Sequence, residues 1–254
     1  MSKTEVKLNE GERIDPLGGG YSIVVSKDHI FGTDAVLLAD FSKIRKNDTA
    51  CDLGSGCGII PLLWCKKESG RLFAVEIQKK ACAQFEKSLS LNLLEGRISV
   101  LNRDLRELKG ALPFGAFDLV TMNPPYKKVG AGIESVSESD KIARHETMCS
   151  IDDCCEAASK LLRFGGRLCL CHRPERLCDV ISSMKKNGIE PKRLRFVSKN
   201  AESAPWLFLI EGKRGAQSFL NIEKNLYIET ADGKMSPELC EIMGDYVKEG
   251  MMQP

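Results

Sequence analysis

The chain contains 254 residues, 43% of them hydrophobic, so it can bury one sizeable core, and we expect a single domain with short additions. Its formal net charge of +2 is too small to indicate a partner, because nucleic-acid binding depends on local clusters of basic residues. The polar first residues do not resemble a secretory leader, and no apolar run approaches the ~18 residues that cross a bilayer, which predicts a soluble protein without a membrane partner.

Residues 1–47 are predicted to form a hairpin and a helix that pack on the core. Stretches 13–15 and 21–25 have strand character and flank a glycine-rich turn at 16–20. The apolar stretch 33–41 is predicted to be a short helix.

Residues 48–214 alternate short apolar runs with stretches of helical period, which is typical of βαβ units and a mostly parallel sheet. Strands are expected at 49–53, 72–76, 98–102, 117–122, 166–171, 191–197 and 206–211. Helices are expected at 58–67, 79–93, 151–162 and 175–187. Ser150 and Asp153 form a capping pair for the third helix. Too few residues separate the last two strands for a crossover helix, so they should form an antiparallel edge pair. The pattern predicts an α/β fold with a Rossmann-like, seven-stranded, doubly wound sheet.

Residues 215–254 are predicted to form a C-terminal appendage. A strand-like stretch at 225–228, a turn at Asp232 and Gly233 and a helix beginning at Ser236 follow one another. Nothing in the sequence indicates an obligate protein partner, and it leaves the oligomeric state open.

Eleven cysteines would suit a disulfide scaffold, but several lie in apolar segments of a long chain that shows no leader. Reduced thiols in a cytoplasmic protein fit this pattern better. The sequence contains no Cys-x-x-Cys pair, and its three histidines are scattered, so no metal site is expected.

A glycine-rich loop at 52–58 follows the first core strand, at the place where open α/β sheets bind nucleotides. Gly54 and Gly56 lack the β-carbons that would keep a ligand from the backbone, so both, with Ser55, are candidate cofactor-binding residues. The spacing differs from the Gly-x-Gly-x-x-Gly of dinucleotide sites, and Asp52 fits a ligand with ammonium and sulfonium charges, such as S-adenosylmethionine. A tight structural turn and a dinucleotide site are the alternatives.

Two acidic residues end the next two core strands. Glu76 closes the second strand, where a carboxylate can accept both hydrogen bonds of a ribose diol, and Ile77 follows it. Asp104 follows the third strand and can accept a bond from an adenine amino group, with Leu105 supplying a backbone N–H. Each acid can instead be an ordinary surface charge.

The tetrapeptide Asn123-Pro124-Pro125-Tyr126 follows the fourth strand beside the same predicted site. An exocyclic amine on a purine or an amide is a poor nucleophile because its lone pair is delocalised. The Asn123 side-chain oxygen and the Pro124 carbonyl can each accept one N–H bond, which holds the amine and localises its lone pair. Pro125 fixes the turn, and Tyr126 can stack on an extruded base. An ordinary proline-containing loop is the structural alternative.

The chain resembles the bacterial valine-tRNA adenine-N6 methyltransferases, and three groups of residues carry the likeness, namely 29–39, 52–61, and 123–126 with 143–146. The resemblance covers roughly residues 11–215. It implies a class I methyltransferase fold, S-adenosylmethionine as cofactor with S-adenosylhomocysteine as product, and a tRNA substrate modified at the adenine just 3′ of the anticodon. It also implies that Thr33 and Asp34 lie near the methionine end of the cofactor, although a helix N-cap explains them as well. Arg103 stands where this family is expected to have glycine.

Basic residues near the predicted rim or the last two strands are candidate RNA contacts, or ordinary solvated surface. They are Lys127, Lys128, Arg144, Lys192, Arg193, Arg195, Lys213 and Arg214. The polar stretch 127–148 is interpreted as a substrate loop, in which His145 serves structure rather than proton transfer.

The tetrapeptide also occurs in glutamine-N5 and guanine-N2 methyltransferases, so a protein glutamine or rRNA guanine substrate remains an alternative. Only about fifty residues precede the first core strand, which disfavours the glutamine enzymes because these generally carry a helical domain there. A DNA adenine enzyme usually needs a recognition domain, for which no stretch is left. An RNA-binding subunit without catalysis is disfavoured by the intact tetrapeptide and Glu76.

Overall fold

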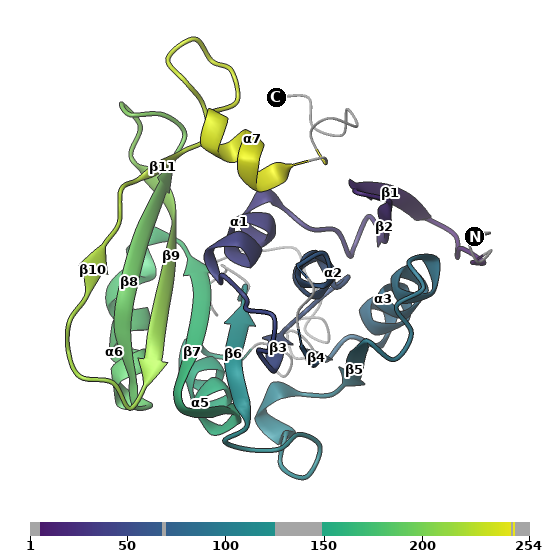
Figure 1. The fold of residues 1–254 in the computed structure, drawn as a ribbon, viewed down its shortest axis with the longest axis horizontal. Helices are drawn as coiled ribbons and strands as arrows, with labels where there is room; N and C mark the ends of the chain where they lie inside the picture. The colour runs from purple at the N-terminus through teal and green to yellow at the C-terminus, as the bar shows by residue number, and fades with distance from the viewer. Residues whose placement is uncertain (1–5, 68–69, 125–148, 245, 247–254) are drawn as a thin grey trace, which may run out of the picture.

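Seven strands of the central sheet arise from the short apolar runs of the sequence, as expected. A computed structural model describes residues 6–67, 70–124, 149–244 and 246 (Figure 1). The strands are β3 (Ala50–Leu53), β4 (Leu72–Glu76), β5 (Ile98–Asn102), β6 (Phe117–Met122), β7 (Leu162–His172), β8 (Ile189–Ser198) and β9 (Pro205–Arg214). They are ordered β5-β4-β3-β6-β7-β9-β8. β3 to β7 are mutually parallel, and β9 runs antiparallel to both β7 and β8, which confirms the predicted edge pair.

Helices cover both faces of this sheet (Figure 1). They are α1 (Thr33–Phe41), α2 (Ile59–Cys65), α3 (Lys79–Leu91), α5 (Ile151–Leu161) and α6 (Leu177–Lys186). Successive side chains of a strand point to opposite faces, so Leu119 of β6 joins the core beneath α1, α2 and α3, whereas Val120 joins the core beneath α5 and α6. The predicted capping pair is confirmed, since Ser150 Oγ accepts from the Asp153 backbone N–H at 3.1 Å and the Asp153 carboxylate accepts from the Ser150 N–H at 2.8 Å.

The N-terminal hairpin consists of β1 (Glu12–Gly18) and β2 (Tyr21–Ser26). Its turn is tighter than predicted, because only Gly19 and Gly20 lie between the strands, both in the left-handed region that suits two-residue hairpin turns. The hairpin packs on α3, where the Val24 N–H donates to Ser88 Oγ at 2.9 Å. Gln84 Nε2 of α3 donates to the backbone carbonyls of Val24 and His29, both at 2.8 Å.

The C-terminal residues add two short strands to the free edge of β8. β10 (Asn221–Ile222) and β11 (Leu226–Tyr227) both pair with β8 in parallel. The predicted strand at 225–228 corresponds to β11, whereas β10 is too short and too exposed to leave a pattern in the sequence. The helix α7 (Pro237–Met243) begins after Ser236, whose Oγ accepts from the Leu239 N–H at 3.1 Å, and it packs on α1. None of the helices in the described part of the chain has the length and apolar character needed to cross a membrane.

Candidate active site

The carboxyl ends of β3, β4, β5 and β6 meet around a cavity of about 330 Å³, which we call the cleft. Residues from six segments line it: Asp28, His29, Ile30, Gly54, Gly56, Cys57, Val75, Glu76, Ile77, Gln78, Arg103, Asp104, Leu105, Met122, Asn123 and Cys149. Seven of the predicted site residues are therefore brought together here, namely Gly54, Gly56, Glu76, Ile77, Asp104, Leu105 and Asn123. In this topology, ligands bind at the carboxyl edge of the parallel strands, so the cleft lies where the fold predicts a site.

The glycine loop is fixed to β4 by its own backbone. The N–H groups of Gly54 and Ser55 both donate to the Val75 carbonyl, at 2.8 and 3.1 Å. Gly54 and Gly56 have φ values of 69° and 52°, and a β-carbon added to either would meet no atom within 4 Å. These two glycines therefore leave open space in the cleft wall where a ligand can contact the backbone.

Gly58 serves packing rather than binding. Its φ is 86°, and an added β-carbon would lie 2.1 Å from the Phe85 ring, which is fully buried. Ser55 is buried as well, and its hydroxyl has no hydrogen-bond partner within the described residues.

Glu76 presents an anchored carboxylate to the cleft although only 5% of the residue is exposed. Its Oε2 accepts from the Gly56 N–H and its Oε1 from the Gln78 N–H, both at 2.8 Å. The Asn102 side chain donates to the carbonyls of Glu76 and Ile77, each at 2.9 Å, which holds the end of β4 in place. Each carboxylate oxygen of Glu76 keeps a second lone pair, so it can still accept a bond from a ligand diol.

Asp52 is buried at the end of β3 and does not line the cleft. Its Oδ1 accepts from the Thr121 hydroxyl at 2.6 Å across the β3–β6 pairing. The pKa of Asp52 is raised to about 7, mainly by burial and in part by the nearby Glu76 carboxylate, against the opposing effect of the Thr121 bond. Asp52, which the sequence predicted to face a cationic ligand, thus lies behind the residues that line the cleft.

The raised pKa of Asp52 makes the stability of the protein depend on pH. Because the folded protein binds this proton more tightly than the unfolded chain, the free energy of unfolding should fall as the pH rises from about 4 to about 7. Asp52→Asn removes this contribution, so the variant should gain stability relative to wild type over that range, by at most about 1.4 kcal/mol per pH unit. Urea unfolding at several pH values measures the difference. If the difference in free energy of unfolding between wild type and Asp52→Asn does not change with pH, Asp52 is not buried in its protonated form.

Asp104 and Leu105 line the cleft as predicted, but the Asp104 carboxylate is already engaged. It caps the short 3-10 turn η1 (Leu105–Glu107) and accepts from the Arg106 N–H at 2.8 Å, the Arg106 Nε at 3.0 Å and the Arg106 Nη2 at 2.5 Å. Its bonds with Arg106 lower the pKa of Asp104 and keep it ionised. The side chain remains an acceptor next to the cleft, with Arg106 holding its orientation.

Thr33 and Asp34 begin α1, where the Asp34 Oδ1 accepts from the Ala35 N–H at 2.9 Å. Neither residue lines the cleft in this structure. The preceding segment does so instead, through Asp28, His29 and Ile30. Sequence analysis singled out none of these three as a site residue, because only the docking of the hairpin on α3 brings them there.

Asn123 stands at the end of β6, in the cleft wall beside Met122. Its Oδ1 accepts a hydrogen bond from the buried Cys171 thiol of the adjacent strand β7, at 3.1 Å. Pro124 is buried, whereas Pro125 and Tyr126 lie outside the described residues. The amide of Asn123 is therefore oriented from behind by a thiol that the sequence pattern did not single out.

Three of the basic residues predicted near the rim or the last two strands lie on the last two strands, β8 and β9, away from the cleft. Lys213 pairs with Arg167 near the start of β7, and Arg214 pairs with Ile189 at the start of β8, so both lie at the amino edge of the parallel strands, opposite the cleft. Lys192 near the start of β8 lies toward that same edge.

Arg193 and Arg195 are occupied by internal partners. Arg193 donates to Glu211 at 2.8 Å and Glu223 at 2.6 Å, and its guanidinium lies 4.4 Å from the centroid of the Phe41 ring. Arg195 donates to both oxygens of Glu238, at 2.7 and 2.8 Å. Lys127, Lys128, Arg144 and His145, with the whole predicted substrate loop at 127–148, lie outside the described residues.

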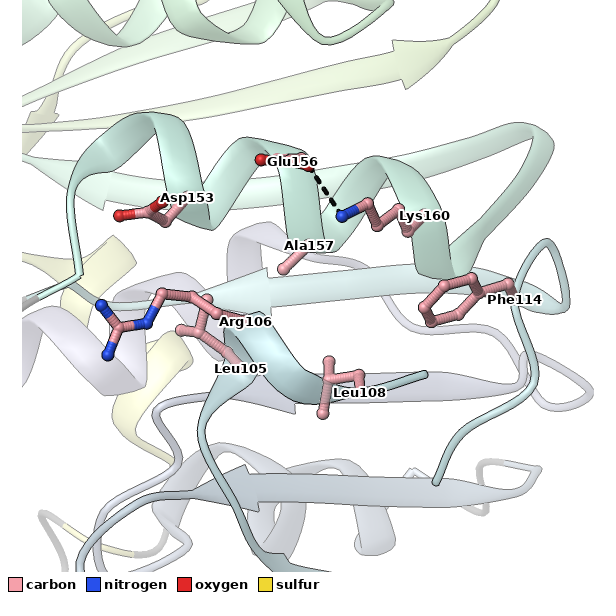
Figure 2. A pocket seen from close by; sticks show the side chains of 8 residues that line it. All are labelled: Leu105, Arg106, Leu108, Phe114, Asp153, Glu156, Ala157 and Lys160. Atoms are coloured by element: carbon pink, nitrogen blue, oxygen red, sulfur yellow. Dashed lines mark ion pairs between the residues drawn. The ribbon is translucent and has the colours of Figure 1, made fainter. Parts of the chain in front are cut away.

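A second, smaller pocket of about 150 Å³ shares Leu105 with the cleft (Figure 2). It lies between η1 and α5, with Asp153 and Arg106 at one end and Phe114 at the other. The ion pair between Glu156 and Lys160, at 2.7 Å, is largely exposed. This pocket contains none of the predicted site residues except Leu105, and we assign the site to the cleft. Within the described residues, no group of histidine, cysteine, aspartate and glutamate side chains could hold a metal ion.

Comparison with curated proteins finds relatives along most of the chain. A tRNA1(Val) (adenine(37)-N6)-methyltransferase of Tolumonas auensis is 24% identical over 239 residues, which cover 90% of this chain and 97% of that protein. A protein of the same name from Parabacteroides distasonis is 27% identical over 208 residues, covering 78% of this chain and 85% of the relative. Another, from Histophilus somni, is 31% identical over 139 residues, 54% of this chain and 58% of its own.

Solved structures share the fold. A predicted O-methyltransferase from Agrobacterium tumefaciens superposes with a TM-score of 0.66 at 21% identity, over 83% of this chain and 95% of that one. Geranyl diphosphate C-methyltransferase from Streptomyces coelicolor, crystallised with S-adenosyl-L-homocysteine, gives 0.54 at 12% identity, over 72% of this chain and 78% of its own. At these identities the likeness establishes the architecture alone.

The family match covers both the cleft and most of the sheet. Residues 21–175 match the methyltransferase small domain, a stretch that runs from β2 into the short 3-10 turn η2 (Pro174–Arg176) and contains every described residue of the cleft wall. The chain belongs to the methyltransferase small domain family.

Proposed function

We propose that this protein is an S-adenosylmethionine-dependent tRNA methyltransferase that modifies the N6 amino group of an adenine. The observation that carries the proposal is the presence of Asn123 in the same cleft as the glycine loop and Glu76. The names of the relatives from Tolumonas auensis and Parabacteroides distasonis support adenine 37 of a valine tRNA as the target. Adenine 37 is the position just 3′ of the anticodon, as the sequence resemblance implies. With tRNA as the substrate, we infer that the protein acts in the cytoplasm.

The cleft wall fits the cofactor. Gly54 and Gly56 leave the backbone open to a ligand, and the Ser55 hydroxyl lacks a hydrogen-bond partner within the described part of the chain. We assign the ribose diol to the Glu76 carboxylate, and the adenine to the wall formed by Ile77 and Leu105 with Asp104 at its edge. When bound, S-adenosylmethionine supplies an electrophilic methyl group. We propose that Thr33, Asp34 and Asp52 lie near the charged methionine end of the cofactor. Asp52 would act from behind the residues that line the cleft.

Asn123 performs the central task of the mechanism. Its Oδ1 accepts one N–H of the substrate amine and the Pro124 carbonyl accepts the other, which turns the nitrogen lone pair toward the methyl group and reduces its delocalisation. The Cys171 thiol donates to the same Oδ1, which orients the amide oxygen at the end of β6. We assign to Pro125 the rigidity of the turn and to Tyr126 the stacking of the extruded base, as the sequence predicts.

The proposed reaction can be tested with unmodified tRNA. The protein is incubated with methyl-labelled S-adenosylmethionine and total tRNA from a strain that lacks this modification, and the tRNA is then separated by isoacceptor and digested to nucleosides. We expect label in N6-methyladenosine from valine tRNA. Parallel reactions replace the tRNA with rRNA or with a protein substrate, and label in N2-methylguanosine of the rRNA, or only in glutamine of the protein, would overturn the proposed substrate.

A matched control separates failure of the substrate from failure of the enzyme. An unmodified valine tRNA transcript carrying guanine at position 37 should accept no label. Calorimetry without RNA should detect binding of S-adenosylhomocysteine to the protein, and this result does not depend on which substrate the enzyme methylates. Absence of cofactor binding would contradict the assignment of the cleft itself.

A further inference from the structure

Two cysteine thiols lie in contact at the edge of the cleft. The Sγ atoms of Cys149 and Cys154 are 3.6 Å apart, close enough for one thiol to donate to the other. Cys149 is partly exposed and lines the cleft, whereas Cys154, in the first turn of α5, is only 2% exposed. The capping box of Ser150 and Asp153 fixes the backbone between them, so the two sulfur atoms are held together by local structure.

The electrostatic surroundings distinguish Cys149 from the other thiol of the cleft wall. The hydrogen bond between the two thiols lowers the pKa of Cys149 and raises the pKa of Cys154, so Cys149 is the thiol of the pair that ionises first. Burial instead raises the pKa of Cys57 to about 12, which leaves that thiol protonated. The thiolate is the form that reacts with oxidants, and of the two thiols in the cleft wall Cys149 forms it more readily.

We propose that Cys149 is a site of reversible oxidation in the cleft wall, with Cys154 as its resolving partner. The Cys149 thiolate attacks one oxygen of a hydroperoxide, the O–O bond breaks, and a sulfenic acid and an alkoxide or hydroxide form. The Cys154 sulfur then attacks the Cys149 sulfur, the S–O bond breaks, and the hydroxyl group leaves as water with the Cys154 proton. The peroxide gains two electrons, the two thiols lose them, and a Cys149–Cys154 disulfide results.

The disulfide changes the cleft because the sulfur atoms must approach from 3.6 Å to about 2.05 Å. Cys154 is buried in the core beneath α5, so the movement falls mainly on Cys149. The Cys149 side chain is then drawn out of a wall that it shares with Leu105 and Asn123. Formation of the disulfide does not depend on the proposed function, whereas its effect on cofactor binding does.

The test treats the reduced full-length protein with a small excess of hydrogen peroxide, alkylates the remaining thiols and maps the peptides by mass spectrometry. We expect the peptide containing Cys149 to lose the mass of two hydrogen atoms before any other cysteine reacts, and dithiothreitol to restore it. Cys155→Ser is the matched control, because Cys155 is the buried neighbour of Cys154 and should leave the disulfide unchanged. Cys154→Ala should instead leave a sulfenic acid on Cys149 that a dimedone probe traps.

Several results would overturn the proposal. One is a disulfide that forms in Cys154→Ala but not in Cys155→Ser, and another is earlier oxidation of the exposed Cys178 or Cys240. Failure of Cys149 to react with peroxide in the wild-type protein would also overturn the proposal. This measurement needs no variant, so it does not depend on whether a variant folds. Saturation with S-adenosylhomocysteine should slow Cys149 oxidation at least tenfold. If the disulfide forms as described but this protection is absent, the ligand assigned to the cleft is wrong and the oxidation site stands.

Discussion

Asn123→Ala should lower the rate of methyl transfer by about two to three orders of magnitude, the loss typical when one preorganised hydrogen-bonding group is removed from an active site. The Oδ1 atom that we propose as the acceptor for the substrate amine is lost, so the amine should keep its lone pair in the π system and should no longer be aligned. Glu76 and the glycine loop are unaffected, so the affinity for S-adenosylhomocysteine should change by less than about threefold. Single-turnover kinetics with valine tRNA measure the rate of methyl transfer, and calorimetry measures the affinity for S-adenosylhomocysteine.

Asn123→Asp is the conservative control for this prediction. It keeps an oxygen that can accept from both Cys171 and the amine, and it should retain more activity than Asn123→Ala. A parallel loss of cofactor affinity in Asn123→Ala would show that Asn123 supports the cofactor rather than the amine.

Gly58→Ala should destabilise the fold by roughly 2–5 kcal/mol, the sum of a left-handed backbone and an overpacked core. The added β-carbon would lie 2.1 Å from the ring of Phe85, and that ring, fully buried beneath α2 and α3, has little room to move. Urea unfolding followed by circular dichroism measures the change.

Gly56→Ala is the matched variant in the same loop. Its φ of 52° carries a similar backbone cost of about 1–2 kcal/mol, but the β-carbon would enter open space in the cleft. We expect a smaller loss of stability than for Gly58→Ala and a clear loss of cofactor affinity, at least tenfold. Equal destabilisation by both substitutions would contradict the division of the loop into a binding part and a packing part.

The sequence predicts the central sheet well because each strand satisfies a local requirement. Parallel strands covered on both faces are mostly apolar, and β3 and β6 show this pattern except at Asp52, Asp118 and Thr121. The approach of Gly54, Glu76 and Asn123 was also predictable, because parallel strands place their carboxyl ends at one edge of the sheet. The capping box before α5 is a similar case, since its donors and acceptors lie within four residues.

Other features depend on contacts between distant segments and leave no local pattern. The sequence could not tell at which edge of the sheet Lys213 and Arg214 lie, because the direction of the last strand decides this and its basic side chains carry no sign of that direction. The ion pair of Arg193 could not be predicted, because its carboxylate partner Glu211 comes from the neighbouring strand. Cys171 gained a role only through the β6–β7 pairing that brings it to Asn123.

The docking of the N-terminal hairpin has a thermodynamic consequence. The wall formed by Asp28, His29 and Ile30 is held in place largely by the Gln84 side chain, which bonds to the carbonyls of Val24 and His29. A ligand that contacts this wall binds only the docked state, so ligand binding and hairpin docking must stabilise each other by the same free energy. Docking of the β1–β2 hairpin should therefore respond to ligand binding in the cleft, and the backbone amides of β2 should exchange with solvent more slowly once the cleft is filled.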